Sequence, residues 1–184
     1  MELIHTGFSE LLVIKPVVFE DARGYFYESF NRQSYKKAGV DFNFVQDNQS
    51  HSTRGIIRGL HYQLVPYAQT KLVRVIEGVI FDVAVDIRQG SATFGKWYGI
   101  ELSGDNKLQL LIPQGFAHGF SVLSEKAVVL YKTDDYYRKD AERGIVFKDP
   151  ELNIDWKIAA SDILISERDR LLPGFRDAES NFII

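Results

Sequence analysis

The sequence predicts an all-β fold, organised as a sandwich, barrel or jelly roll, and three observations favour this class. Short apolar stretches recur along the chain, as the strands of such folds do. Aromatic residues make up 13% of the sequence, and aromatic and β-branched side chains favour pleated, half-buried surfaces. Glycines separate the stretches, as the turns between short strands require. These glycines are Gly90, Gly95, Gly104, Gly115 and Gly119.

Length and composition narrow the class of protein further. A chain of 184 residues fits one domain, which we expect to extend over residues 1–184. The net charge of −3 offers no excess of cations for general binding to nucleic acid. The absence of cysteine excludes disulfides, thiolate-ligated zinc and thiol catalysis. No secretory signal and no apolar run near the roughly 20 residues of a membrane span are visible, so we expect a soluble cytoplasmic protein.

The first part of the chain predicts strands and one helix. Strands are expected over residues 11–18, 25–29 and 44–50, and a helix over residues 31–38. Pro16 interrupts the first strand, which predicts an edge strand or a bulge there. Residues 21–24 form a turn before the second strand. Gly39 fits the C-terminal cap of the helix.

The middle of the chain carries the clearest strand signal. Side chains alternate over residues 81–88, with Phe81 and Val83 on one face and Asp82 on the other. Residues 72–76 precede this strand across Glu77-Gly78, which predicts a β-hairpin. Further strands are expected over residues 97–102, 108–112, 120–123 and 127–133. Residues 161–172 are compatible with a helix and with a strand followed by a turn.

Two of the four histidines stand in motifs that suggest chemistry. His61 lies in the stretch RGLHYQ at residues 58–63, and His118 lies in PQGFAHGF at residues 113–120. The second stretch is a turn that delivers a histidine onto the next strand, flanked by small residues. A packed structural role remains open for both histidines.

The two motifs resemble a degraded metal site of the cupin type. Metal-binding cupin barrels need H-x-H, a nearby glutamate and a later P-x-G-x-x-H. Here the first element offers His61 and the weak amide of Gln63, and Lys71 stands near the place of the glutamate. An ammonium repels a divalent cation and has no lone pair to give. The sequence therefore predicts a cupin-like barrel without a metal, in which His61 is a candidate base and Lys71 stabilises an enolate oxygen.

Several cations suggest an anionic ligand. If they converge, a diphosphate is the expected ligand, because arginine binds it with two hydrogen bonds. If they do not, they are scattered solvated charges, and the sequence leaves both possibilities open. No P-loop or dinucleotide motif is present. The cations are Arg23, Arg58, Lys71, Arg74, Arg88 and Arg168.

Taken together, the motifs closely resemble the dTDP-4-dehydrorhamnose 3,5-epimerase family over nearly the whole chain. They lie at residues 21–28, 44–48, 58–63, 71–75, 82–88, 113–120, 131–133 and 166–173. No single motif would suffice. The resemblance implies a cupin-type jelly roll with a few short peripheral helices, a homodimer, and no metal or other cofactor.

The resemblance also implies a reaction. The family inverts C3 and C5 of dTDP-4-dehydro-6-deoxy-D-glucose to give dTDP-4-dehydro-L-rhamnose, on the way to dTDP-L-rhamnose. Both carbons flank the C4 ketone, so one enolate strategy serves both. By the family pattern His61 is the general base, Asp169 orients it, Lys71 stabilises the enolate oxygen and Tyr131 returns a proton on the opposite face.

The resemblance assigns further residues to the nucleotide sugar. It implies that the N-terminal strands reach into the partner subunit, so that Arg23 and Glu28 serve the neighbouring site. The family usually has lysine where this chain has Arg168, and the length around Glu142 varies. The implied contacts are Arg23, Glu28, Gln46, Asp47, Asn48, Arg58, Lys71, His118, Glu142 and Arg168.

Three other functions remain alternatives. One is an epimerase that acts at a single carbon, or on a related nucleotide 4-keto sugar. Another is a non-catalytic cupin that binds a nucleotide sugar, which the joint presence of His61, Lys71 and Tyr131 disfavours. The third is a metal-dependent cupin oxygenase.

Overall fold

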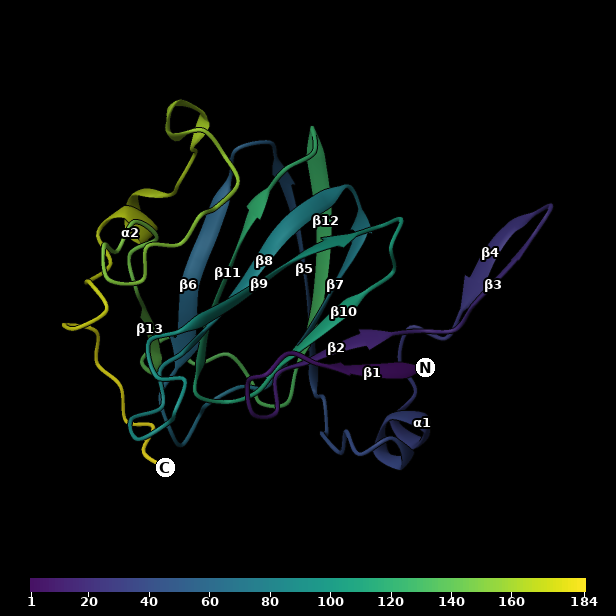
Figure 1. Cartoon of the computed structure of the whole chain (residues 1–184), viewed down its shortest axis with the longest axis horizontal. Helices are drawn as coiled ribbons and strands as arrows, with labels where there is room; N and C mark the ends of the chain where they lie inside the picture. The colour runs from purple at the N-terminus through teal and green to yellow at the C-terminus, as the bar shows by residue number, and fades with distance from the viewer.

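A computed structural model describes residues 1–184, and its two antiparallel sheets confirm the all-β prediction (Figure 1). The arrangement agrees with the predicted jelly roll. Its helices are short and lie at the periphery: α1 (Arg32–Lys37), η1 (Ala160–Asp162) and α2 (Glu167–Arg170). None of the helices has the length and hydrophobicity that a membrane-spanning helix needs.

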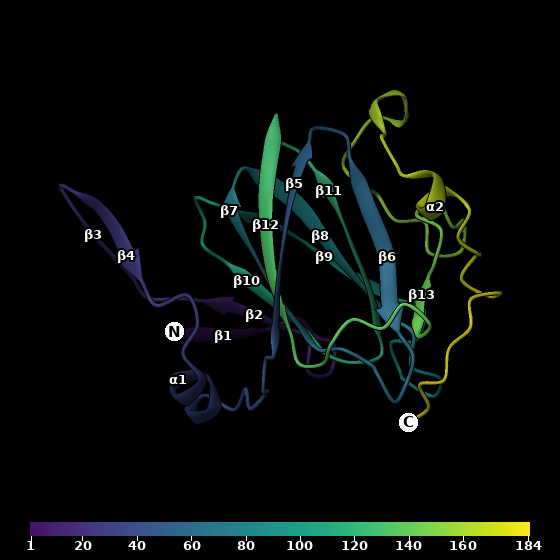
Figure 2. The ribbon, with the colours of Figure 1, turned by 180° about the vertical axis from the view of Figure 1, so that it is seen from behind.

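Strands of one sheet alternate in sequence with strands of the other sheet. The six-stranded sheet has the order β1 (Glu2–His5), β2 (Leu12–Lys15), β10 (Gln109–Ile112), β7 (Lys71–Glu77), β12 (Lys126–Thr133) and β5 (Gln46–Thr53). The five-stranded sheet has the order β13 (Glu142–Gly144), β6 (Ile57–Gln63), β11 (Phe116–Val122), β8 (Val79–Asp86) and β9 (Trp97–Ser103). Figure 2 shows the two sheets from behind.

The alternation along β8 separates two hydrophobic cores. Ile80 and Ala84 pack with Val73 and Val129 of the other sheet. Phe81, Val83, Val85 and Ile87 pack on the opposite face of β8, against apolar residues of the C-terminal segment. Both faces of this strand are therefore buried. The C-terminal segment covers the outer face of the sheet in the way a third layer does.

The predicted hairpin across Glu77-Gly78 is wrong. β7 belongs to the six-stranded sheet and β8 to the five-stranded sheet, so the chain crosses between sheets at this turn. Gly78 has φ +83°, and a Cβ there would lie 2.0 Å from the carbonyl oxygen of Lys126. Glycine is therefore needed at this position because two backbone segments pass close together. In the sequence alone, such a glycine cannot be distinguished from the glycine of a hairpin turn.

The N-terminal region confirms most predicted elements and corrects one. β2 ends at Lys15, just before Pro16, but it pairs with strands on both sides and is not an edge strand. A separate hairpin, β3 (Val18–Asp21) and β4 (Gly24–Tyr27), turns at the predicted place and projects away from the barrel (Figure 1). Asn31 caps the predicted helix, and Gly39 follows it with φ +95°.

The C-terminal segment combines the two possibilities that the sequence left open. Leu164 forms a single parallel bridge with Ile56, and α2 begins three residues later. Ser166 caps this short helix, because its hydroxyl accepts a hydrogen bond from the Asp169 N–H at 3.1 Å. The segment therefore reaches β6 and places one turn of helix beside it.

Candidate active site

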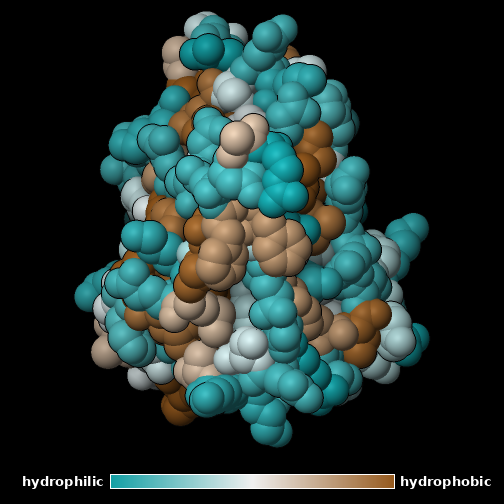
Figure 3. Space-filling view, turned by 90° about the vertical axis from the view of Figure 1, so that its right-hand side faces the viewer, coloured by the Kyte–Doolittle hydropathy of each residue, from teal (hydrophilic) through white to brown (hydrophobic).

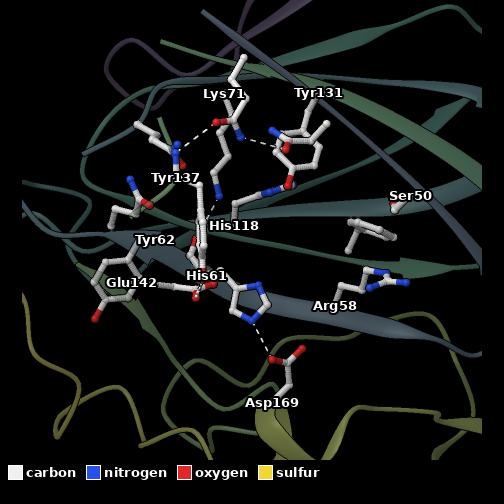
Figure 4. Close-up of a pocket in the computed structure, with 15 residues that line it drawn as sticks. Ser50, Arg58, His61, Tyr62, Lys71, His118, Tyr131, Tyr137, Glu142 and Asp169 are labelled. Atoms are coloured by element: carbon white, nitrogen blue, oxygen red, sulfur yellow. Dashed lines mark hydrogen bonds and ion pairs between the residues drawn. The ribbon is translucent and has the colours of Figure 1, made fainter. Parts of the chain in front are cut away.

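A pocket opens between the two sheets and gathers most of the predicted site residues (Figure 4). β5, β7 and β12 supply one wall, and β6 and β11 supply the other. The lining residues are Gln46, Asn48, Ser50, Arg58, His61, Tyr62, Gln63, Gln69, Lys71, His118, Phe120, Tyr131, Tyr137, Glu142 and Asp169.

His61 and Asp169 form a hydrogen-bonded pair in the pocket. His61 Nε2 lies 2.7 Å from Asp169 Oδ1 (Figure 4). Burial would raise the pKa of Asp169, but the hydrogen bond and charge of His61 hold it below its usual value. The carboxylate of Asp169 accepts a hydrogen bond from the Nε2–H of His61, and this tautomer leaves the lone pair of Nδ1 free. This arrangement makes Nδ1 a base.

The local backbone explains how these two residues meet. β6 passes so close to β11 at Gly59 that a Cβ there would lie 2.5 Å from the Gly119 Cα. The Gly59 N–H, two residues before His61, also donates to Asp169 Oδ2 at 3.3 Å. The Ser166 cap holds the first turn of α2 from the other side. Asp169 is therefore fixed by both its main chain and its carboxylate.

Lys71 places a cation in the wall opposite the pair. Its side chain is buried, and Nζ donates to the His61 carbonyl oxygen at 3.3 Å. Burial lowers the pKa of Lys71 to about 8, although the charges of Asp82 and Glu142 oppose this shift. The Lys71 amine is therefore mostly protonated at neutral pH, and the resulting ammonium is shielded from water. A cation in this state is well suited to stabilise a developing oxyanion.

His118 lies across the strand pair from His61 but has its own carboxylate partner. The two histidines face each other in the β6–β11 register. His118 Nε2 lies 2.7 Å from Asp82 Oδ1, and both side chains are buried. Burial lowers the pKa of His118 despite the charge of Asp82. His118 is therefore a neutral polar group of the pocket.

Tyr131 enters the pocket from the other sheet. It stands on β12, whereas His61 stands on β6. Figure 4 shows Tyr131 and Lys71 entering from the side opposite Asp169. Burial, with the charge of Glu142, raises the pKa of Tyr131. Its phenol thus stays protonated at neutral pH and can act as an acid.

The predicted cations converge only in part. Arg58 and Lys71 line the pocket, and Arg168 forms an ion pair with Glu142 at its rim. The other three do not converge. Arg88 is buried against Asp86, Arg74 donates to the Tyr27 hydroxyl, and Arg23 pairs with Asp21 on the projecting hairpin.

The side chains of β5 alternate, which separates Asp47 from its neighbours. Gln46 and Asn48 line the pocket, and Gln46 Nε2 donates to Asn48 Oδ1 at 2.9 Å. Asp47 points away and pairs with Lys132 at 2.8 Å, since successive strand residues face opposite sides. The Asp47 side chain therefore does not line the pocket, and its expected contact with the nucleotide sugar stays a prediction.

Arg23 and Glu28 also lie outside the pocket of their own chain. Arg23 is on the hairpin tip, and Glu28 follows β4 and accepts a hydrogen bond from Asn31 at 2.8 Å. No strand of the barrel pairs with this hairpin. Neither side chain therefore lines this pocket within one chain.

Several lining residues were not singled out by the sequence analysis. Ser50 follows Gln46 and Asn48 at the same two-residue spacing, so strand alternation alone could have found it. Tyr137 and Gln69 lie in loops, where no periodicity points to them. These residues are Ser50, Tyr62, Gln69, Phe120 and Tyr137.

His61, Gln63 and Lys71 occupy the positions where a metal-binding cupin has its ligands, and these side chains suit proton transfer better than metal binding. No three side chains of His, Asp or Glu converge as metal ligands. The Gln63 amide is occupied by main-chain groups of the Tyr67 and Tyr136–Arg138 loops. What remains is a base, a buried cation and an acid around one cavity. Such a set can remove a proton beside a carbonyl group and return one from the other side.

Comparisons with known proteins agree with this chemistry. The family model for dTDP-4-dehydrorhamnose 3,5-epimerase matches residues 5–177. The chain is 52% identical to the dTDP-4-dehydrorhamnose 3,5-epimerase of Shigella flexneri, with 97% of this chain and 98% of the relative covered. It resembles the crystal structure of the enzyme of that name from Elizabethkingia anophelis at 51% identity and a TM-score of 0.92, with coverage of 96% and 97%.

A third comparison includes a bound sugar nucleotide. The crystal structure of dTDP-6-deoxy-D-glucose-3,5-epimerase from Legionella pneumophila, in complex with dTDP-4-keto-L-rhamnose, is 47% identical. Its TM-score is 0.91, and the match covers 96% of this chain and 93% of the other.

Proposed function

Because the chain belongs to the dTDP-4-dehydrorhamnose 3,5-epimerase family, we propose that His61, Lys71, Tyr131 and Asp169 carry out the reaction of that family in this protein. The chain is an isomerase. It epimerises dTDP-4-dehydro-6-deoxy-D-glucose at C3 and C5, which gives dTDP-4-dehydro-L-rhamnose. The observation that carries the assignment of residues is the His61–Asp169 pair facing Tyr131 from the opposite sheet.

The two faces of the pocket suit an inversion. His61 Nδ1 removes the proton from a carbon next to the C4 ketone, and the electron pair moves to the C4 oxygen. The Lys71 ammonium stabilises that oxyanion. The Tyr131 hydroxyl then protonates the carbon from the other face. Solvent afterwards takes the extra proton from His61 and returns a proton to the Tyr131 phenolate. A lone base that returned its proton to the same face would cause no net change.

The remaining lining residues are proposed to hold the nucleotide sugar. Arg58 supplies a guanidinium for a phosphate, and His118 supplies a neutral imidazole. The side-chain amides of Gln46 and Asn48 line the same pocket and can hydrogen-bond the substrate. Asp47 could contact the substrate only through its main chain, because its side chain pairs with Lys132. Glu142 and Arg168 already pair with each other at the rim, so we place them at the mouth of the pocket.

Incubation with the keto-sugar nucleotide in D₂O tests this function. We expect deuterium at both C3 and C5, because each inverted carbon receives its proton from groups that exchange with solvent. Mass and NMR analysis of the sugar measures the incorporation. Deuterium at one carbon only would identify a single-carbon epimerase. No exchange by a protein that still binds the nucleotide would identify a binding protein and contradict the proposal.

We further propose that the protein is a homodimer in which each β3–β4 hairpin completes the site of the partner subunit. A two-stranded hairpin is marginal alone, and this one exposes 63% of Phe19, 56% of Tyr25 and 71% of Phe26. Figure 3 shows hydrophobic patches on the side of the molecule from which it projects. Burial against a second copy would remove these rings from water and bring Arg23 and Glu28 to a pocket.

Mixing two inactive variants tests this arrangement. Arg23→Ala and His61→Asn each damage every site of their own homodimer. In a heterodimer, one barrel keeps His61 and receives an intact hairpin. Random mixing after dissociation is therefore expected to restore about a quarter of the sites, since half of the dimers are mixed and each carries one intact site. Activity that never exceeds the mean of the two variants would contradict the exchange of hairpins.

Three further expectations stay predictions. They are that residues 1–184 form a single domain, that the protein is cytoplasmic, and that the reaction needs no metal or cofactor.

A further inference from the structure

The side-chain amide of Gln63 makes three hydrogen bonds to main-chain groups of two loops next to the pocket. Gln63 ends β6, two residues after His61, and its side chain is buried. Its Nε2 donates to the carbonyl oxygens of Tyr67 at 2.6 Å and Tyr136 at 3.2 Å. Its Oε1 accepts from the N–H of Arg138 at 2.6 Å. Both donors of the amide and one acceptor position are thus committed to main-chain groups.

Two of these contacts bracket Tyr137. The main chain on either side of Tyr137 is held by Gln63, and the Tyr137 N–H donates to Gln46 Oε1 at 3.2 Å. The Tyr137 hydroxyl donates to Glu142 Oε2 at 2.7 Å. The ring lines the pocket while half of its surface stays exposed. Tyr137 therefore forms part of the pocket mouth, on a loop with no sheet partner of its own.

We infer that Gln63 is a positioning residue, which fixes the 136–138 loop so that Tyr137 forms a rigid wall of the nucleotide-sugar site. Gln63 does not reach the reacting carbons. It acts by removing the freedom of a loop that substrate would otherwise have to order on binding, and such ordering weakens affinity. This inference rests on the proposed function, because it assigns Gln63 to substrate binding in that reaction.

Replacing Gln63 with methionine tests the inference. Methionine is unbranched and similar in length but makes no hydrogen bond to the loop. Losing these contacts is expected to raise KM for the sugar nucleotide about tenfold, while kcat stays within about threefold. The same substitution at Gln33, which is exposed on α1, is the matched control and should change neither constant. Gln63→Asn, one methylene shorter, serves if the methionine variant does not fold.

A double-mutant cycle with Tyr137→Ala separates positioning from a general loss of structure. If Gln63 acts through Tyr137, Gln63→Met should change KM less than about twofold once the ring is gone, since the two residues form one unit. Folded Gln63 variants with a wild-type KM would overturn the inference, and so would effects that multiply in the double mutant. Wild-type protein without epimerase activity would instead overturn the proposed function, so the two failures are distinguishable.

Discussion

Replacing His61 with asparagine is expected to lower kcat by about 10²–10⁴, which is the rate factor that a positioned general base contributes. Asparagine keeps a polar side chain of similar size but cannot take up a proton. Deuterium incorporation at C3 and C5 should fall with the rate, since both depend on proton removal. Single-turnover kinetics and NMR of the sugar in D₂O measure the two effects separately.

Binding provides the control for the His61 variant. His61 acts on the sugar, so calorimetric affinity for dTDP should stay close to that of the wild type. The same substitution at His51, an exposed residue of β5 outside the pocket, should leave both rate and exchange unchanged. A His61→Asn protein that still exchanges both positions at the wild-type rate would assign the base to another residue.

Tyr131→Phe is expected to uncouple exchange from inversion. The variant keeps His61, Asp169 and Lys71, so a proton can still leave and deuterium can still return to the same face. The phenol that would deliver it to the other face is gone, and epimerised product should fall by about 10²–10⁴. NMR distinguishes deuterated starting sugar from inverted sugar in one sample.

Tyr98→Phe is the matched control for Tyr131→Phe. Tyr98 lies on β9, and burial raises its pKa as burial does for Tyr131, but it does not line the pocket. Its variant should invert both carbons normally. Efficient inversion of both carbons by Tyr131→Phe would show that water or another side chain supplies the second proton.

The sequence predicted strands better than it predicted their partners. Alternation along residues 81–88 and the Gly39 signal at the end of the helix are local, and the structure confirms them. The turn at Glu77-Gly78 looks like a hairpin because glycine permits either a tight turn or a close passage between backbones. Only the position of Lys126, 48 residues beyond Gly78, decides between the two. Pro16 likewise ended a strand without making it an edge.

In the candidate site too, local sequence motifs identify some residues, whereas the role of others depends on how distant segments pack. His61 and His118 stand out by their motifs, whereas Asp169 is an ordinary-looking acid until α2 brings it within 2.7 Å of His61. The resemblance to a family, and not spacing, pointed to Asp169 beforehand. Strand alternation could have excluded the Asp47 side chain and included Ser50. Nothing local marks Tyr137, and the motif marked Gln63 only as a weak metal ligand, because both roles depend on which loops pack together.

The separation of His61 from Asp169 along the chain has a consequence during synthesis. The strands that surround the pocket are complete at Thr133, while Asp169 follows His61 by 108 residues. Asp169 lies 36 residues beyond Thr133, so at roughly 5–20 residues per second it leaves the ribosome on the order of 2–7 s after the last of these strands. A nascent chain can therefore assemble its barrel around an imidazole that still lacks its carboxylate. Until α2 docks, His61 lacks the carboxylate that orients its ring, so a chain truncated before α2 is expected to turn over more slowly than the full chain.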